Sequence, residues 1–524
     1  MFDNFNLKQK DKYYLFFIVI FNIILIGYYI NFNSNIGIFC SDVYIYLQNA
    51  AYYAGKHIAS TQNIYLSPII CFMTSLLFRL GLYDKLAIYI ITGAFAVFGN
   101  IGFYILLKKY FDENLSLCGT IIYSTLPLYL IWLANGTLDI PAVSMIIWIA
   151  LFTLIAVDEN PKYYPYLIIL IALGVFTRYT VLLSIPAFLL YYIYKKGFKI
   201  KKEDLKYIAK GILIAVIISV LIFTLISTVG NSEFAVKGQI SDGISGNQGS
   251  QIDSAYNTDV SYYISNIPNF ISTSHSLFEA NPVLKTPTIL SWAIIGMLII
   301  GMGLWIYDHR RKPEKSDVYP IFFFIIAIIS FTRISSVITT IFVLICLYLL
   351  GKKSPEKNVY FMLAWIFSNI IFLSYYNIKV NRYFLPAFPP IIYFIILSIK
   401  TINQHININK NIIPTLLILI FIAQAFIFPF TFEPTYEYKG IEDVSDYIIE
   451  NNPDYENMTI GVYNIRPFSW WLGNNIIGLV SANQTAIDES NATYYISNKQ
   501  LDNLTEYDEV KNFGKYYLYE KISV

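Results

Sequence analysis

The sequence predicts a polytopic α-helical membrane protein with about thirteen transmembrane helices, interfacial helices in the first outer loop and a small C-terminal α/β domain. Of its 524 residues, 56% are hydrophobic and 14% are charged, whereas about 25% of an average soluble protein is charged. This apolar excess is larger than one soluble core needs, so much of it must face lipid. We expect a transmembrane domain over residues 1–431 and an extracytoplasmic α/β domain over residues 432–524.

The predicted spans follow from the apolar runs. A membrane-spanning helix needs about 17 to 25 mostly apolar residues, and fewer where neighbouring helices shield it. Thirteen such runs occur, at residues 13–30, 86–107, 114–133, 140–157, 164–177, 179–194, 211–229, 288–307, 319–332, 334–350, 359–376, 383–399 and 411–431. Residues 64–82 are also apolar, but they carry Pro68 and Arg79. If they spanned the membrane, every later loop would lie on the opposite side. We interpret them as a helix lying on the outer leaflet.

The basic residues set the orientation. With thirteen spans and an inner N-terminus, 22 of the 37 lysines and arginines fall in inner segments, nine in outer loops and six in the C-terminal segment. Loops rich in lysine and arginine stay on the cytoplasmic side. We therefore expect a multi-pass protein of the cell membrane with a cytoplasmic N-terminus and an extracytoplasmic C-terminal domain. The net charge of +2 gives no reason to expect a nucleic-acid partner.

Two polar stretches interrupt the pattern of spans. Residues 230–287 are rich in Gly, Ser and Asn and predict a long outer loop, and loops of this length are more often functional than idle. In the C-terminal segment, hydrophobic periodicity predicts a helix at residues 441–452 and strands at 458–464, 475–483, 492–498 and 515–522.

Two acidic residues lie next to predicted spans. Asp42 follows the first run, in CSDVYIYLQNAAYYAG, and Asp139 follows the third, in NGTLDIP. Ionisable groups close to the hydrocarbon are costly and mark functional sites. A carboxylate at Asp42 could take a proton from an acceptor group as a general base. The structural alternative is that each acid caps the helix that it opens.

Three single arginines each occupy a tight outer turn between apolar runs: Arg178 in FTRYT, Arg333 in FTRIS and Arg382 in VNRYF. We expect them to converge above the bundle and hold a phosphate diester, because the forked donors of guanidinium match phosphate oxygens. Arg382 also begins RYFLPAFPP, where prolines free backbone groups near the interface. The alternative for each is a snorkelling arginine that marks the membrane boundary.

Tyr383 and Tyr44 complete the predicted substrate-binding set, since aromatic rings pack against sugars as well as forming interfacial belts. Neither the histidines nor the four cysteines show metal-ligand spacing, so no metal site is predicted. No cofactor is indicated, and a divalent metal is left open.

The ordered set SDVYIYLQNAAYYAG, YLSPII, NGTLDIP, TRYT and NRYFLPAFPP resembles the C-type glycosyltransferases, in the branch of protein O-mannosyltransferases and lipid A aminoarabinose transferases. The resemblance covers about residues 10–400. It implies that Asp42 and Asp139 are the catalytic acids and that Arg178 and Arg382 hold a carrier phosphate, while Arg333 matches the pattern least.

This sequence departs from those families at two places. Ser67 stands where the aminoarabinose transferases have a lysine, and Val43 follows the first acid where the O-mannosyltransferases have a second one. These departures leave the sugar and the acceptor unassigned.

The function that the resemblance implies is transfer of a sugar from a polyprenyl- or dolichyl-phosphate carrier to an acceptor protein, lipid or glycan on the outer face, within membrane lipid. The alternatives are a transporter or flippase of lipid-linked saccharides and a ligase that uses a diphosphate carrier. A transporter typically has repeat-related halves and broken helices near the bilayer midplane, and the sequence shows neither pattern.

Overall fold

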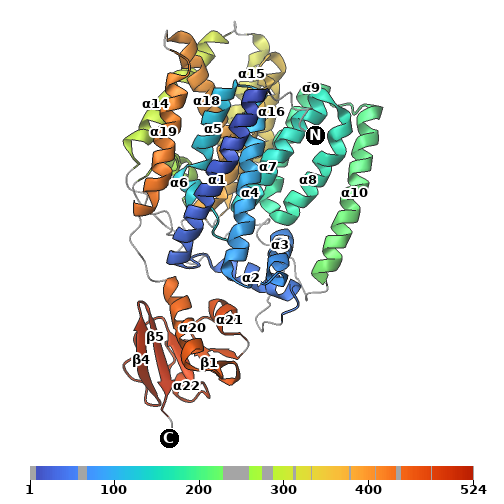
Figure 1. Cartoon of the computed structure of the whole chain (residues 1–524). Helices are drawn as coiled ribbons and strands as arrows, with labels where there is room; N and C mark the ends of the chain where they lie inside the picture. The colour runs from blue at the N-terminus through green and yellow to red at the C-terminus, as the bar shows by residue number, and fades with distance from the viewer. Residues whose placement is uncertain are drawn as a thin grey trace.

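The computed structural model describes residues 8–56, 68–227, 259–273, 287–310, 314–331, 333–376, 379–406, 409–431, 438–473 and 475–522. Its helices form one bundle, and a small sheet with short helices lies at one end of that bundle (Figure 1). The beginning of the first helix and the C-terminus lie at opposite ends of the molecule (Figure 1). His57 and His275, most of the long polar loop and Ser67 lie outside the described residues.

The first half of the bundle contains α1 (Gln9–Ile36), α2 (Ser41–Tyr53), α3 (Pro68–Arg79), α4 (Lys85–Lys108), α5 (Glu113–Ser124), α6 (Pro127–Ile131), α7 (Asp139–Leu154), η2 (Ile155–Glu159), η3 (Pro161–Tyr163), α8 (Tyr164–Thr177), η4 (Tyr179–Ser184), α9 (Ile185–Lys196) and α10 (Lys202–Ser227).

The second half contains α12 (Tyr262–Ser265), α13 (Ile267–Ile271), α14 (Ile289–Asp308), η5 (Lys315–Asp317), α15 (Val318–Ser330), α16 (Ser336–Lys353), α17 (Lys357–Tyr375), η6 (Asn381–Ala387), α18 (Phe388–His405), α19 (Ile412–Ile427) and η7 (Phe428–Thr431).

The helices support a multi-pass membrane protein, although the predicted count of thirteen spans is not confirmed. In the described parts of the chain, nine helices are long and apolar enough to cross a membrane. The other four predicted runs contain helices of 12 to 14 residues, at α5, α8, α9 and α15. Proline contributes to the interruption of these predicted spans. For example, Pro127 is the first residue of α6, which follows α5.

The segment between α1 and α4 carries two short helices. α2 has 13 residues and α3 has 12, so at about 1.5 Å per residue each is roughly 20 Å long and cannot cross a hydrocarbon core of about 30 Å. The two helices pack on each other, and their buried residues form one hydrophobic cluster with residues 87–91 of α4. The sequence predicts an interfacial helix over residues 64–82, and the described part of that range, residues 68–82, fits this position.

Close packing of α4 on α7 fixes the helix that carries Asp139. A Cβ atom on Gly99 would lie 2.8 Å from Cβ of Ser144, and one on Gly102 would lie 2.8 Å from the Trp148 ring, so the small residues let the two helices approach. The Ser144 hydroxyl also donates to the Phe95 carbonyl oxygen at 2.7 Å. A side chain larger than hydrogen at either glycine would therefore displace α7.

The C-terminal segment contains α20 (Lys439–Asn451), η8 (Tyr455–Asn457), β1 (Ile460–Val462), α21 (Ile465–Leu472), β2 (Ile476–Gly478), α22 (Gln484–Asp488), β3 (Tyr494–Ser497), β4 (Tyr507–Phe513) and β5 (Tyr516–Lys521). The sheet has the order β2-β1-β3-β5-β4, with β1 parallel to β2 and β3 and with β5 antiparallel to β3 and β4.

The predicted C-terminal helix and four strands all correspond to observed elements, at α20, β1, β2, β3 and β5. The sequence did not predict β4. Five of its seven residues, YDEVKNF, are exposed and three are charged, and β4 is an edge strand with one hydrogen-bonded neighbour. Charged residues protect such an edge from pairing with other chains and also remove the apolar alternation that identifies a strand.

Candidate active site

Four ionisable side chains from four separate elements meet at one end of the bundle. Asp42 lies in the first turn of α2 and Asp139 in the first turn of α7. Arg178 follows α8 in an extended conformation, and Arg382 is the second residue of η6. The partial positive charge of a helix N-terminus favours a carboxylate at each of the two acidic positions.

Two ion pairs connect these side chains. Nη2 of Arg382 lies 2.7 Å from Oδ2 of Asp42, and Nη1 of Arg178 lies 3.0 Å from Oδ2 of Asp139. Nε of Arg382 lies 3.8 Å from that same oxygen of Asp139 and so joins the two pairs. Nη1 of Arg382 also donates to Sγ of Cys40 at 2.9 Å. Arg382 is therefore the centre of the cluster.

The four side chains differ in their access from outside. The exposed fraction is 3% for Asp139 and 9% for each of Arg178 and Arg382, but 31% for Asp42. A molecule that approaches the cluster would therefore meet Asp42 first. Among the described residues, the buried Nε of Arg382 makes no hydrogen bond, and it lies 3.8 Å from Oδ2 of Asp139.

Tyr383 contacts both arginines. Its ring centre lies 5.4 Å from Cζ of Arg178 and 5.6 Å from Cζ of Arg382. Arg382 also lies 5.5 Å from the ring of Trp132, whose Nε1 donates to Oδ1 of Asn381 at 3.0 Å. Cation–π attraction holds the guanidinium groups in place without neutralising their charge.

The surrounding charges keep Asp42 ionised. Burial acts to raise its pKa, but the charge and hydrogen bond of Arg382 and the charges of Arg178 and Arg466 outweigh burial and lower the pKa below the ordinary aspartate value. Asp42 is thus a carboxylate at neutral pH, which is the form that accepts a proton.

Neither acid occupies the N-cap position of its helix. Cys40 is the N-cap of α2 and Leu138 that of α7, and neither makes a side-chain capping bond. By contrast, Asp84 caps α4 by accepting from the Leu86 backbone N–H at 2.7 Å. The ion pairs with arginine therefore explain why acidic residues occupy positions 42 and 139 better than helix capping does.

Two of the predicted site residues lie apart from the cluster. Arg333 is exposed in the turn between α15 and α16. Tyr44 is 3% exposed and packs in a hydrophobic cluster with Trp470 of the C-terminal segment. It points away from Asp42 because residues two apart on a helix face different sides.

The structure also adds residues that sequence reasoning did not select. Tyr46 is 2% exposed and lies within reach of the charges of Asp42, Arg178 and Arg382. Tyr46 lies four residues after Asp42 on α2, and this spacing could have identified it from the sequence. Cys40 does not have this spacing from Asp42. It joins the site because Arg382, which is distant in the sequence, donates a hydrogen bond to its sulfur.

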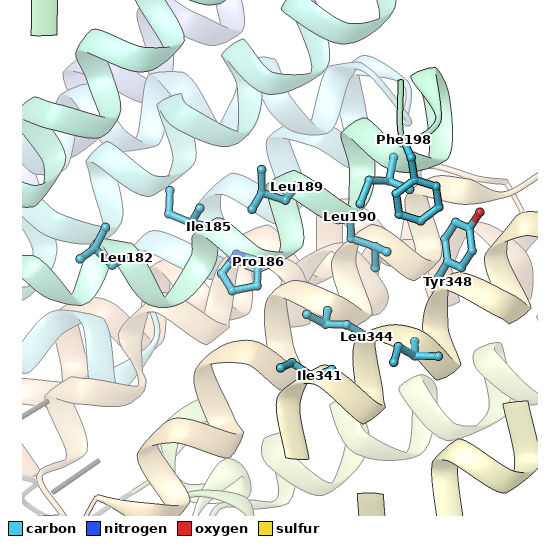
Figure 2. Close-up of a pocket in the computed structure, with 11 residues that line it drawn as sticks. Leu182, Ile185, Pro186, Leu189, Leu190, Phe198, Ile341, Leu344 and Tyr348 are labelled. Atoms are coloured by element: carbon cyan, nitrogen blue, oxygen red, sulfur yellow. The ribbon is translucent and has the colours of Figure 1, made fainter. Parts of the chain in front are cut away.

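An apolar groove of about 510 Å³ lies beside the bundle, between α16 and the segment formed by η4 and α9. Figure 2 shows Leu182 at one end and Phe198 with Tyr348 at the other. The lining is formed by Leu182, Ile185, Pro186, Leu189, Leu190, Ile193, Phe198, Ile341, Leu344, Ile345 and Tyr348. Leu182, which lines one end of the groove, follows Arg178 by four residues in the sequence.

Comparison with known proteins supports one fold. Residues 66–223 match the family model described as "Dolichyl-phosphate-mannose-protein mannosyltransferase". ArnT from Cupriavidus metallidurans bound to undecaprenyl phosphate is 11% identical, with a TM-score of 0.58 over 97% of this chain and 98% of that one. The structure of ArnT from the same organism in the apo state is 11% identical, with a TM-score of 0.54 over 92% of this chain and 93% of that one. No curated protein matches in sequence. The predicted resemblance to the C-type glycosyltransferases is confirmed, and what is shared is the fold.

Proposed function

We propose that this chain is a membrane glycosyltransferase that moves a sugar from a polyprenyl- or dolichyl-monophosphate carrier to a protein, lipid or glycan acceptor on the outer face of the membrane. The observation that carries the proposal is the cluster of Asp42, Asp139, Arg178 and Arg382, which combines a partly exposed carboxylate with two arginines. The C. metallidurans structure contains undecaprenyl phosphate, a carrier of this chemical class, which supports the same class here.

Arg178 and Arg382 would bind the phosphate of the carrier. Guanidinium groups match phosphate oxygens with paired donors, and the two arginines lie in one cluster, where Arg382 is within 3.8 Å of the carboxylate that pairs with Arg178. A phosphate at Arg382 would compete with Asp42 for the same guanidinium. Weakening that ion pair raises the proton affinity of Asp42, so donor binding would make the carboxylate a stronger base.

Asp42 would act as the general base. As the acceptor oxygen or nitrogen attacks the anomeric carbon, Asp42 takes its proton, and the bond from that carbon to the phosphate oxygen breaks. The electron pair leaves on the phosphate, where the two arginines stabilise the new charge. Asp139 is paired with Arg178 at 3.0 Å and is 3% exposed, so it would position that arginine rather than exchange a proton with the acceptor.

The apolar chain of the carrier would lie in the groove between α9 and α16. This groove begins four residues from Arg178, and leucine, isoleucine, proline and aromatic side chains line it. A phosphate at the arginines and a polyprenyl chain in the groove would keep the reacting phosphate at the membrane surface and the tail in an apolar environment.

The proposal includes an orientation. The C-terminal segment and α2 lie at the same end of the bundle (Figure 1), so an outer active site requires an outer C-terminus. We expect a reporter fused to the C-terminus to be active on the extracytoplasmic side, and one fused to the N-terminus to be active in the cytoplasm. A C-terminal reporter active solely in the cytoplasm would contradict the outer-face assignment.

The direct test is incubation of the purified protein with a panel of polyprenyl- and dolichyl-phosphate sugars, together with peptide, lipid and glycan acceptors. We expect release of the lipid phosphate to depend on one sugar class and to be matched by acceptor modification. Binding of lipid-linked sugars without any phosphate release, across the whole panel, would favour a transporter instead.

A further inference from the structure

Part of the polar stretch at residues 230–287 packs against the element that carries Arg382. The described part of this stretch includes residues 259–273, which contain the short helices α12 and α13. Tyr263 of α12 is 0% exposed, and its ring stacks on Phe384 of η6 with ring centres 5.6 Å apart. Phe270 of α13 packs on the same ring at 5.5 Å. These aromatic contacts fix η6 against a segment that is distant from it in the sequence.

A hydrogen bond also joins Tyr263 to the backbone just before Arg382. The Tyr263 hydroxyl donates to the carbonyl oxygen of Val380, the N-cap of η6, at 3.1 Å. The same oxygen accepts from the Tyr383 backbone N–H at 3.1 Å. A side chain that makes no ion pair in the cluster therefore holds the chain two residues before Arg382.

This hydrogen bond persists when the partner of the arginine changes. Arg382 pairs with Asp42 at 2.7 Å, and a bound phosphate would compete with Asp42 for that guanidinium. The bond from Tyr263 to Val380 and the bond from Trp132 to the Asn381 side chain do not involve the guanidinium. They hold η6 in place in both states, so the arginine need not be ordered again when the phosphate binds.

We propose that Tyr263 is a positioning residue for Arg382, which fixes the backbone at Val380 so that the paired donors of the guanidinium meet the phosphate of the lipid carrier. The assignment rests on the proposed function and deepens it. It gives the polar stretch at residues 230–287 a part in donor binding, which Tyr263 exerts through Arg382 rather than by contact with the phosphate.

The neighbouring tyrosine supplies a matched control. Tyr262 is 1% exposed and belongs to the same short helix, but its buried hydroxyl has no hydrogen-bond partner among the described residues. Tyr262→Phe and Tyr263→Phe each remove one buried hydroxyl and keep the ring. The two variants therefore differ in the bond to Val380.

The experiment measures equilibrium binding of undecaprenyl phosphate and dolichyl phosphate to the purified full-length protein. We expect Tyr263→Phe to weaken binding about fivefold, as for loss of one hydrogen bond, and Tyr262→Phe to bind as the wild type does. In an Arg382→Lys background, Tyr263→Phe should weaken binding less than about twofold, because a flexible ammonium meets phosphate without a fixed orientation.

The outcomes separate this inference from the function that it assumes. Equal binding by the wild type and Tyr263→Phe would overturn the role of Tyr263 and leave the proposed function standing. Equal losses in the two phenylalanine variants would also overturn it, as would a loss of the same size in the Arg382→Lys background, because Tyr263 would then act independently of the guanidinium. Absence of binding by the wild type to either probe would overturn the inference and the proposed function together.

Discussion

Asp42→Asn is expected to lower the turnover of a lipid-linked sugar about 100- to 10,000-fold, which is the usual cost of losing a positioned general base. The amide keeps the shape of the side chain and an oxygen that can accept from Arg382, but it cannot take a proton. Folding and carrier binding should therefore change little. Asp139→Asn should lower turnover less steeply, because Asp139 orients Arg178 and lies away from the open side of the cluster.

Asp84→Asn is the matched control for this substitution. Asp84 lies between α3 and α4 and caps α4 by accepting from the Leu86 backbone N–H, a role in which asparagine is as good as aspartate. Its turnover should equal that of the wild type. The decisive measurement is single-turnover sugar transfer by Asp42→Asn protein with confirmed carrier binding, and near-normal transfer would remove Asp42 from the mechanism.

Arg382→Ala is expected to weaken use of the lipid donor about 30-fold or more, since truncating one member of a hydrogen-bonded buried charge pair costs about 2–5 kcal/mol. The change removes the contacts of Arg382 with Asp42 and Asp139 and leaves both carboxylates less well compensated. Arg382→Lys should lie between the wild type and the alanine variant, because lysine retains the charge but not the planar fork.

Arg333→Ala controls for the loss of an arginine at a turn between two apolar helices. Arg333 occupies the similar sequence FTRIS but is exposed and lies apart from the cluster, so its removal should leave donor use close to that of the wild type. Donor KM, kcat and thermal unfolding should be measured for all three variants, and the lysine variant tests the role even if the alanine variant is unstable. Indistinguishable donor use in the wild type and both Arg382 variants would make Arg382 a boundary marker.

Local sequence patterns identified candidate site residues but did not show which of them contact one another. Arg178, Arg333 and Arg382 each stand in a short turn between apolar runs, and their local sequences alone give nearly the same expectation. In the fold, Arg178 and Arg382 lie with the two acids, whereas Arg333 is exposed. The same limit applies to Tyr44, which packs with Trp470, a residue more than 400 positions away.

The sequence by itself determined the class of protein, the places of the apolar helices and most of the C-terminal elements, because hydrophobic runs and periodicity are local properties that depend on lipid contact or burial. The tertiary structure decided the lengths of the helices and the pairing of side chains within the cluster. Asp42 and Arg382 are 340 residues apart, and no local rule predicts a contact of that separation. It arises because α2 packs on α3 and η6 packs on α17, and these positions bring Asp42 and Arg382 together.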